Sequence, residues 1–180
     1  LGIFNPYLDP YKVHFTKDLP MYDIAAYNKY PKHRFVYDKL FIAQTQKIQC
    51  GLLSHLSKRT DVKYPIFIKP RWGHKSASSK NCFKIKEFDE VINHLDKEDM
   101  MWTEFIDARE TMTDFLMVGG KIMYQMTSVY SEKQNGFIDD WKFIGDSNKP
   151  PKSIVKWVDE HMKNYTRVCN VQYRGDVIIE

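Results

Sequence analysis

The apolar residues of this chain repeat with two different spacings, and each spacing predicts a different kind of element. From residue 34 to residue 56 they recur at helical spacing, which predicts a helix, a break near 46–51 and a short continuation. The same spacing predicts a helix over 87–95 and, after a pair of prolines, another over 153–164. Residues 1–33 show weak periodicity and many Tyr, Pro and Asp residues, which favours extended segments or the remnant of a preceding domain.

Short runs rich in β-branched and aromatic residues predict strands between these helices. The predicted strands are 66–68, 82–85, 100–106, 111–118, 121–130, 167–173 and 176–180. Gly119 and Gly120 predict a tight turn between two of them, and residues 131–151 are typical of a loop. The order αββαβββαββ lacks a repeated parallel crossover, so the sequence predicts an α+β fold with mostly antiparallel sheets.

Composition limits the kind of protein and the kind of partner. The chain has 180 residues and 43% hydrophobic content, enough for a real core in one compact unit or two small lobes. Lys and Arg number 27 against 23 Asp and Glu, which gives a formal charge of +4 without any block of like charges. This mild excess suits a nucleotide or another anionic ligand, and it is too diffuse to indicate nucleic acid.

The cysteines and the apolar runs indicate a compartment. The three cysteines are widely spaced without a C-x-x-C pair, which argues against a disulfide framework or a zinc ribbon. No apolar run reaches the length of a membrane span, and the N-terminal residues lack the pattern of a secretory leader. We therefore expect a soluble, cytoplasmic protein with no membrane partner.

The stretch YPIFIKPRWGHKSASSKNCFKI carries the first indication of chemistry. A short apolar strand leads to Lys69, and the loop that follows contains Gly73, Ser76 and Ser78. Backbone N–H groups and hydroxyls in such a loop can bind an anion, so the stretch predicts a hairpin that folds as a lid over a polyphosphate. The pattern of a Walker loop is absent. The alternative is a solvated turn rich in Ser and Lys.

Taken in order, this hairpin, the strand WTEFIDARE, the hairpin around TDFLMVGGK and the closing NVQYRGDVIIE resemble the ATP-grasp superfamily. The chain is similar to the ATP-binding region of carbamoyl phosphate synthetase and of D-alanine–D-alanine ligase. The resemblance implies an ATP-grasp domain over 34–180, in which two α+β lobes hold ATP between them. A lid lobe is expected at about 61–105 and a C-terminal lobe at about 106–180, after an N-terminal segment, 1–33.

The resemblance implies which residues meet the phosphates of ATP. Lys39, in YDKL, and Lys69, in FIKP, match the two basic residues that act in catalysis, while Gly73, Ser76 and Ser78 fall in the lid. Two ammonium groups that approach from different elements offset the several charges of a triphosphate. Without the resemblance, Lys39 is equally typical of a solvated helix lysine.

The resemblance also implies an adenine hinge and a ribose ligand. Thr103, Glu104, Phe105 and Ile106 match the hinge, whose backbone N–H and C=O groups read the adenine edge. Glu110 falls at the position whose carboxylate accepts from the ribose hydroxyls. For the side chains of Phe105 and Ile106, a place in the core of a strand is the alternative.

A magnesium site is implied at the end of the sequence. Gln172, in NVQY, and Glu180, in VIIE, match two of the three ligands of the family. Mg²⁺ prefers oxygen ligands and takes few of them from protein, because phosphates and water complete its shell. The asparagine of the family pattern would follow Glu180. The alternatives are an exposed strand residue and a charged chain end.

Three functions remain open from the sequence. The first is an ATP-dependent ligase that uses ATP and Mg²⁺ to join an unidentified carboxylate to an amine or thiol through an acylphosphate. The second is a degenerate or regulatory module that only binds nucleotide, which the single lid glycine, Gly73, favours. The third is a protein-interaction domain, supported by 11 Tyr and 11 Phe. A homo-oligomer is compatible with each.

Overall fold

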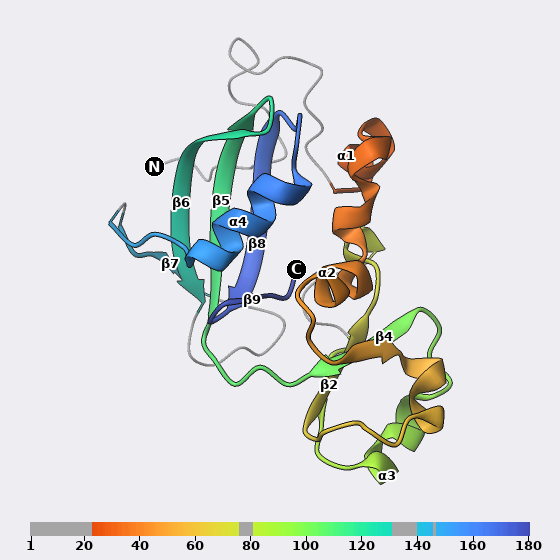
Figure 1. Ribbon diagram of the computed structural model, residues 1–180. Coiled ribbons are helices and arrows are strands. Elements are labelled where there is room, and N and C mark those ends of the chain that lie inside the picture. The colour runs from red at the N-terminus through yellow and green to blue at the C-terminus, as the bar shows by residue number, and fades with distance from the viewer. Residues whose placement is uncertain (1–22, 76–80, 131–139, 146) are drawn as a thin grey trace, which may run out of the picture.

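The computed structural model describes residues 23–75, 81–130, 140–145 and 147–180. They form an α+β fold with two sheets, which we call the small sheet and the large sheet (Figure 1). The small sheet has the strand order β1-β4-β2-β3 and the large sheet the order β7-β6-β5-β8-β9. Every strand pair in both sheets is antiparallel. The predicted fold class is confirmed.

The small sheet is built around a strand whose alternate residues are buried. Ile66 and Ile68 of β2 are fully buried, and they pack with Trp102 of β4 against the short helices of this part. A side chain at Gly51 would approach the indole nitrogen of Trp102 to 2.9 Å, so this glycine lets the ring close over the strand. The elements are β1 Cys50–Leu52, η2 Leu53–Lys58, β2 Ile66–Pro70, η3 Gly73–Lys75, β3 Phe83–Ile85, α3 Phe88–Val91, η4 Ile92–His94 and β4 Met100–Glu104.

The large sheet carries one helix, α4, on one face (Figure 1). Phe115 and Met117 of β5 alternate with the exposed Leu116 and Val118, and they pack against Ile154 and Val158 of α4, both buried. The turn predicted at Gly119 and Gly120 is confirmed, with a φ of 57° at the first residue. The elements are β5 Glu110–Val118, β6 Lys121–Tyr130, β7 Trp141–Phe143, α4 Lys152–His161, β8 Arg167–Arg174 and β9 Val177–Ile178.

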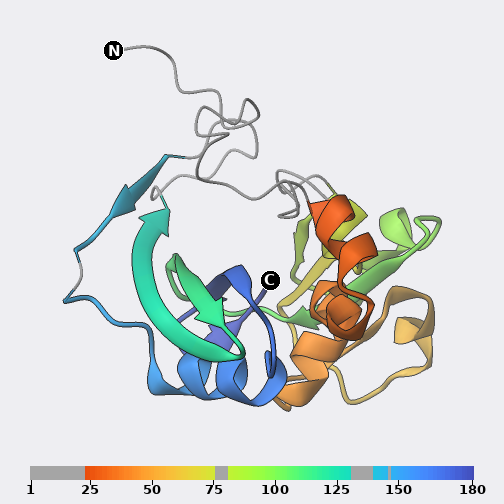
Figure 2. The same cartoon turned by 90° about the horizontal axis from the view of Figure 1, so that it is seen from above.

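Helix α2, Lys39–Thr45, joins the two sheets. Its Ile42 belongs to the core beneath the large sheet, while Leu40 and Ala43 pack against Met101 of β4 in the small sheet. Two further helices precede it, α1 Asp23–Lys29 and η1 Pro31–Tyr37. Seen from above, the two sheets lie on either side of the chain end marked C (Figure 2). The helix therefore fixes the side chains at its start between the two sheets.

Three predicted elements are wrong in part. Residues 50–52, predicted to lie at the end of a helix break and the start of its continuation, form β1 because Cys50 and its neighbours pair with Thr103 and the rest of β4. The predicted loop over 131–151 contains β7, which pairs with β6. The segment predicted to be extended contains α1. Within the described ranges, no helix is long and apolar enough to cross a membrane.

Candidate functional site

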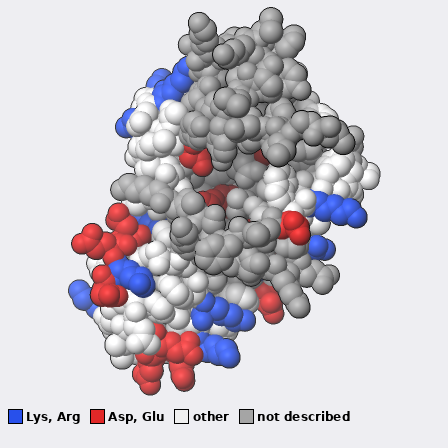
Figure 3. Space-filling model, turned by 180° about the vertical axis from the view of Figure 1, so that it is seen from behind, with Lys and Arg blue, Asp and Glu red and all other residues white. Residues whose placement is uncertain are grey.

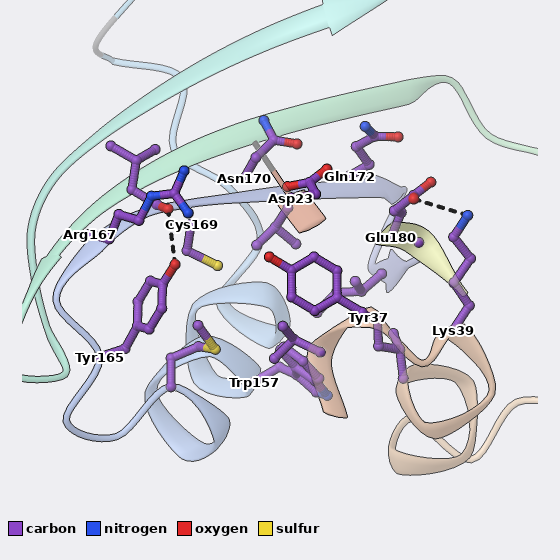
Figure 4. A pocket seen from close by; sticks show the side chains of 17 residues that line it. Asp23, Tyr37, Lys39, Trp157, Tyr165, Arg167, Cys169, Asn170, Gln172 and Glu180 are labelled. Carbon is purple, nitrogen blue, oxygen red and sulfur yellow. Dashed lines mark hydrogen bonds and ion pairs between the residues drawn. The ribbon is translucent and has the colours of Figure 1, made fainter. Parts of the chain in front are cut away.

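Two buried lysines from different elements contact the two residues that follow β9. Lys39 begins α2 and is 5% exposed, and Lys69 lies in β2 and is 7% exposed. Lys39 Nζ lies 2.9 Å from Glu180 Oε1 (Figure 4), and Lys69 Nζ donates to the carbonyl of Ile179 at 2.8 Å. The structure thus brings together two residues predicted for phosphate and one predicted for metal.

The charge balance of this cluster favours an anion. Burial, and then the nearby ammonium of Lys39, lower the pKa of Lys69 from 10.5 to about 8, although the carboxylate of Glu180 acts in the opposite direction. A buried lysine whose charge is disfavoured in this way gains most from a negatively charged ligand. Two ammonium groups beside one carboxylate leave a positive charge for such a ligand to neutralise.

An ion pair that the sequence analysis did not single out holds the two lysines in place. Asp38 caps α2 by accepting from the Leu40 N–H at 3.0 Å, and it binds Arg71 through two oxygens at 2.8 and 2.5 Å. The N–H of Lys39 donates to the Arg71 carbonyl at 3.0 Å. The pair therefore ties the start of α2 to the end of β2. The sequence offers one indication of this pair, because Asp38 and Arg71 lie next to or near the predicted lysines in YDKL and FIKPR.

Gly73 lies against the same cluster. A Cβ at this position would meet Glu180 Oε1 at 3.1 Å and Lys39 Cε at 3.8 Å. The glycine thus allows the backbone at the start of the predicted lid to approach the Lys39–Glu180 pair closely. Ser76 and Ser78, also predicted for the lid, lie outside the described residues.

The two predicted metal ligands meet at a bulge between β8 and the end of the chain. The Gln172 carbonyl accepts from the N–H groups of both Ile179 and Glu180, at 2.8 and 3.2 Å, so two residues oppose one. Among the described residues, no group of three His, Cys, Asp or Glu side chains could hold a metal. The amide and carboxylate oxygens of Gln172 and Glu180 nevertheless fit a hard cation such as Mg²⁺, which needs few protein ligands.

The predicted hinge lies where the chain passes from the small to the large sheet. The N–H of Glu104 donates to Gln49 at 2.8 Å, and the N–H of Phe105 donates to Pro65 at 3.1 Å. Thr103 is buried in β4, while the ring of Phe105 lies under Lys84 Nζ at 3.7 Å from its centroid. The N–H groups of Glu104 and Phe105 are therefore already hydrogen-bonded to backbone carbonyls. The next N–H group along the chain that could bind an adenine base is that of Ile106.

Glu110, predicted for ribose, begins β5 and is ion-paired. Its Oε2 lies 2.8 Å from a guanidinium nitrogen of Arg174, which also binds the Ala108 carbonyl at 3.1 Å. Glu110 contributes to the electrostatic field at Lys69, so the two lie in one region of the molecule. Any ribose hydroxyl must share this carboxylate with Arg174.

A pocket of about 270 Å³ extends from this cluster along β8 (Figure 4). It brings predicted residues together with others that come from distant parts of the sequence, and no local motif links them. The predicted residues that line it are Lys39, Gly73, Gln172 and Glu180, and the unpredicted polar ones are Asp23, Tyr37, Tyr165, Arg167, Cys169 and Asn170. The predicted hinge, Lys69 and Glu110 do not line this pocket.

Charged side chains of both signs are mixed on the face of the molecule that is seen from behind. In the space-filling view from behind, Lys and Arg side chains alternate with Asp and Glu at the end that carries the small sheet, and acidic atoms lie inside the central hollow (Figure 3). The positive charge that the site offers thus comes from the two buried lysines and not from a basic face on this side.

Comparison with known proteins gives matches in structure alone. No family model matches the sequence, and no curated protein matches it closely enough to count as a relative. An L-amino acid ligase from Bacillus licheniformis matches with a TM-score of 0.62 and 15% identity, over 90% of this chain and 45% of that one. The ATP-grasp ligase PsnB, complexed with a minimal precursor, matches with a TM-score of 0.56 and 10% identity, over 86% of this chain and 54% of its own.

A carboxyaminoimidazole ribonucleotide synthase from Aspergillus clavatus, complexed with ATP, matches with a TM-score of 0.58 and 10% identity, over 81% of this chain and 44% of that one. The chain has the ATP-grasp fold. It spans about half the length of these ATP-grasp structures. At such identities the likeness concerns the fold, as the resemblance in the sequence implied.

Proposed function

We propose that the chain binds Mg-ATP between its two sheets and forms the nucleotide site of an ATP-dependent ligase that joins a carboxylate to an amine or thiol. The observation that carries this proposal is that Lys39 contacts the Glu180 carboxylate while Lys69 contacts the carbonyl of the preceding residue, Ile179. The ATP-grasp fold supports it, since the solved structures with that fold include an L-amino acid ligase, a synthase complexed with ATP and a synthetase from Staphylococcus aureus complexed with ADP. Residues 34–180 would make up the ATP-grasp domain, with a lid lobe at 61–105.

On this proposal the nucleotide follows the order of the predicted residues. Adenine meets the C=O of Glu104 and the N–H of Ile106, the backbone groups two residues apart in the predicted hinge. Glu110 accepts from the ribose, and the phosphates reach the ammonium groups of Lys39 and Lys69 beside Gly73. Each ammonium moves little, because both side chains are already buried and directed toward the cluster.

The reaction has two steps. A carboxylate oxygen attacks the γ-phosphorus of ATP, and the bond from that phosphorus to the β–γ bridging oxygen breaks. The products of this step are ADP and an acylphosphate. The amine nitrogen then attacks the acyl carbon and the bond to the phosphate oxygen breaks. An ammonium substrate gives up two protons, one of which leaves on inorganic phosphate and the other to solvent. Mg²⁺, held by Gln172 and Glu180, would supply charge stabilisation at the phosphates.

The lysines of the chain act by electrostatics and not as nucleophiles. Lys39 and Lys69 offset charge on the transferring group, where a low dielectric makes each contact stronger than in water. Cys169, the thiol beside the pocket, has its pKa raised to about 12 by burial, so it stays neutral and inert near pH 7.

The test is nucleotide binding followed by turnover. Calorimetry with Mg-ATP should give saturable binding that Lys39→Met weakens by about tenfold to a hundredfold, the value of one charge-assisted hydrogen bond. Lys58→Met, an exposed lysine of η2, is the matched control. ADP release that depends on added carboxylate and amine then separates a ligase from a module that only binds nucleotide. Absence of Mg-ATP binding would refute both.

A further inference from the structure

One pocket follows a single strand for six consecutive residues. Residues 167–172 of β8 all line it, and Asp23 and Tyr37 face them from the N-terminal helices. One end of the pocket is closed by Lys39, Gly73 and Glu180, where the proposed function puts the phosphates. The strand rises about 3.3 Å per residue, so its lining residues cover about 17 Å. This length exceeds what the phosphate cluster needs.

The two charges in the pocket away from the phosphate cluster have opposite signs. Arg167 belongs to the far end of the strand, and Asp23 lies between it and the Lys39–Glu180 pair (Figure 4). Among the described residues neither of them forms an ion pair. Both act on one hydroxyl, that of Tyr37, whose pKa burial raises to about 12, with Asp23 adding to the effect and Arg167 opposing it. An anion and a cation of the protein thus stand close to one point of the pocket.

The backbone of β8 adds polar groups on the same side. Gln172 turns its N–H and C=O toward Ile179 and Glu180, so alternation along the strand turns those of Val168 and Asn170 to the same edge. The Val168 carbonyl accepts from the Tyr165 hydroxyl at 3.4 Å, which agrees with this direction. The N–H and C=O of Asn170 therefore face the pocket at the level of Asp23, and they can bind the polar atoms of a small ligand.

The size and the floor of the pocket limit that ligand. A volume of about 270 Å³ is below the range of about 300–1,000 Å³ that holds drug-sized ligands. Trp157, Met162 and Val171, all buried, supply an apolar floor. A small metabolite with two opposite charges and an apolar side chain satisfies these walls, whereas a helix or a folded partner does not enter them.

We propose that this pocket binds the amine substrate of the ligase, an α-amino acid, with its ammonium group at Asp23 and its carboxylate at Arg167. The proposal rests on the proposed function. Asp23 lies nearer to the phosphate cluster than Arg167 does (Figure 4), so the ammonium group of the ligand faces the phosphates and its carboxylate faces away. The ligand is therefore the amine substrate and not the acyl substrate. A carboxylate directed at the phosphates in this pocket would meet Asp23 and be repelled. The acyl donor therefore approaches the γ-phosphate by another side.

The test uses binding to the protein saturated with Mg²⁺ and a non-hydrolysable ATP analogue. Calorimetry is done with the proteinogenic amino acids, and each is compared with its carboxamide and its N-acetyl derivative. At least one amino acid should show saturable binding. Its two derivatives should bind about tenfold to a hundredfold more weakly, since each loses one charge-assisted contact. This comparison needs no variant, so it does not depend on how a substitution affects folding.

Two variants assign the contacts. Arg167→Gln should remove the preference for the free carboxylate over the carboxamide, and Asp23→Asn should weaken binding of the amino acid, while both keep the affinity for the ATP analogue. Arg59→Gln and Asp89→Asn, exposed residues of the small-sheet part, are the charge-matched controls. If the ATP analogue binds and no amino acid binds beside it, the amino acid site is refuted and the proposed function is not. An analogue that does not bind before any amino acid is added overturns the proposed function itself.

The direction of the ligand has its own readout. In one assay the amino acid is the only carboxylate and the only amine added. If ADP still forms, the carboxylate of the amino acid is the group that is phosphorylated, and the proposed orientation is wrong. ADP formation that requires a separate carboxylate supports it.

Discussion

Replacing Lys69 with methionine should separate stability from nucleotide binding. Lys69 is 7% exposed, and burial lowers the pKa of its ammonium from 10.5 to about 8. Methionine has a similar length without the charge, so it can occupy the same space in β2. The ligand-free protein should therefore lose little stability at pH 7, or gain some, although it loses the bond to the Ile179 carbonyl.

The magnitude follows from proton linkage. In the folded state Lys69 gives up its proton near pH 8, whereas in the unfolded chain it keeps it to 10.5. Between these values the unfolded state binds more protons, so the free energy of unfolding rises with pH through this window. The rise amounts to about 3 kcal/mol, because each tenfold change in proton affinity is worth about 1.4 kcal/mol. Below pH 8 this gain is absent.

Denaturant unfolding at several pH values between 7 and 10.5 measures the effect. The difference between the wild type and Lys69→Met isolates this group from the tyrosines and other lysines that titrate in the same range. The variant should lack the rise and should bind Mg-ATP about tenfold to a hundredfold more weakly. A variant that binds Mg-ATP as tightly as the wild type, or that shows the same rise with pH, would refute the reasoning.

Three other substitutions test parts of the same site. Gly73→Ala should leave the free energy of unfolding within about 1 kcal/mol and weaken Mg-ATP binding severalfold, because its Cβ meets the Glu180 carboxylate at 3.1 Å; calorimetry measures it. Gly175→Ala, at a φ of +56°, is the control, and it should cost about 1 kcal/mol without affecting the nucleotide. Asp38→Asn should cost about 1–3 kcal/mol in thermal unfolding, since it leaves Arg71 without its carboxylate. Glu180→Gln should raise the Mg²⁺ concentration needed for tight ATP binding, and an unchanged Mg²⁺ requirement would remove it from the metal site.

The sequence predicted the longer strands of both sheets and missed one three-residue strand in each, β1 and β7. Strands β5, β6 and β8 and helix α4 are long enough for local pattern to decide them. β1 has only three residues, and it is a strand because β4 pairs with it from some 50 positions away. Nothing in Cys50–Leu52 itself distinguishes a strand from a helix. Long-range pairing of this kind is beyond a reading of local spacing.

For the site, the sequence identified the residues that carry a motif. Lys39, Lys69 and Glu180 could be aligned with a family pattern, and the structure brings them within contact of one another or of adjacent backbone. Asp23 and Arg167 could not be found in this way. They stand in no motif, and only the fold places them in the lining of one pocket, Asp23 from α1 and Arg167 from β8. Residues that select a substrate rather than a nucleotide are of this second kind.

Hydrogen–deuterium exchange with and without Mg²⁺ and a non-hydrolysable ATP analogue tests the central claim most directly. If ATP binds between the two sheets, protection should appear together in three separate segments, at Lys69–Gly73, at Thr103–Asp107 and at Gln172–Glu180. The helices α3 and η4, at the far side of the small sheet, should exchange unchanged. Binding of the analogue without protection in these three segments would contradict the account.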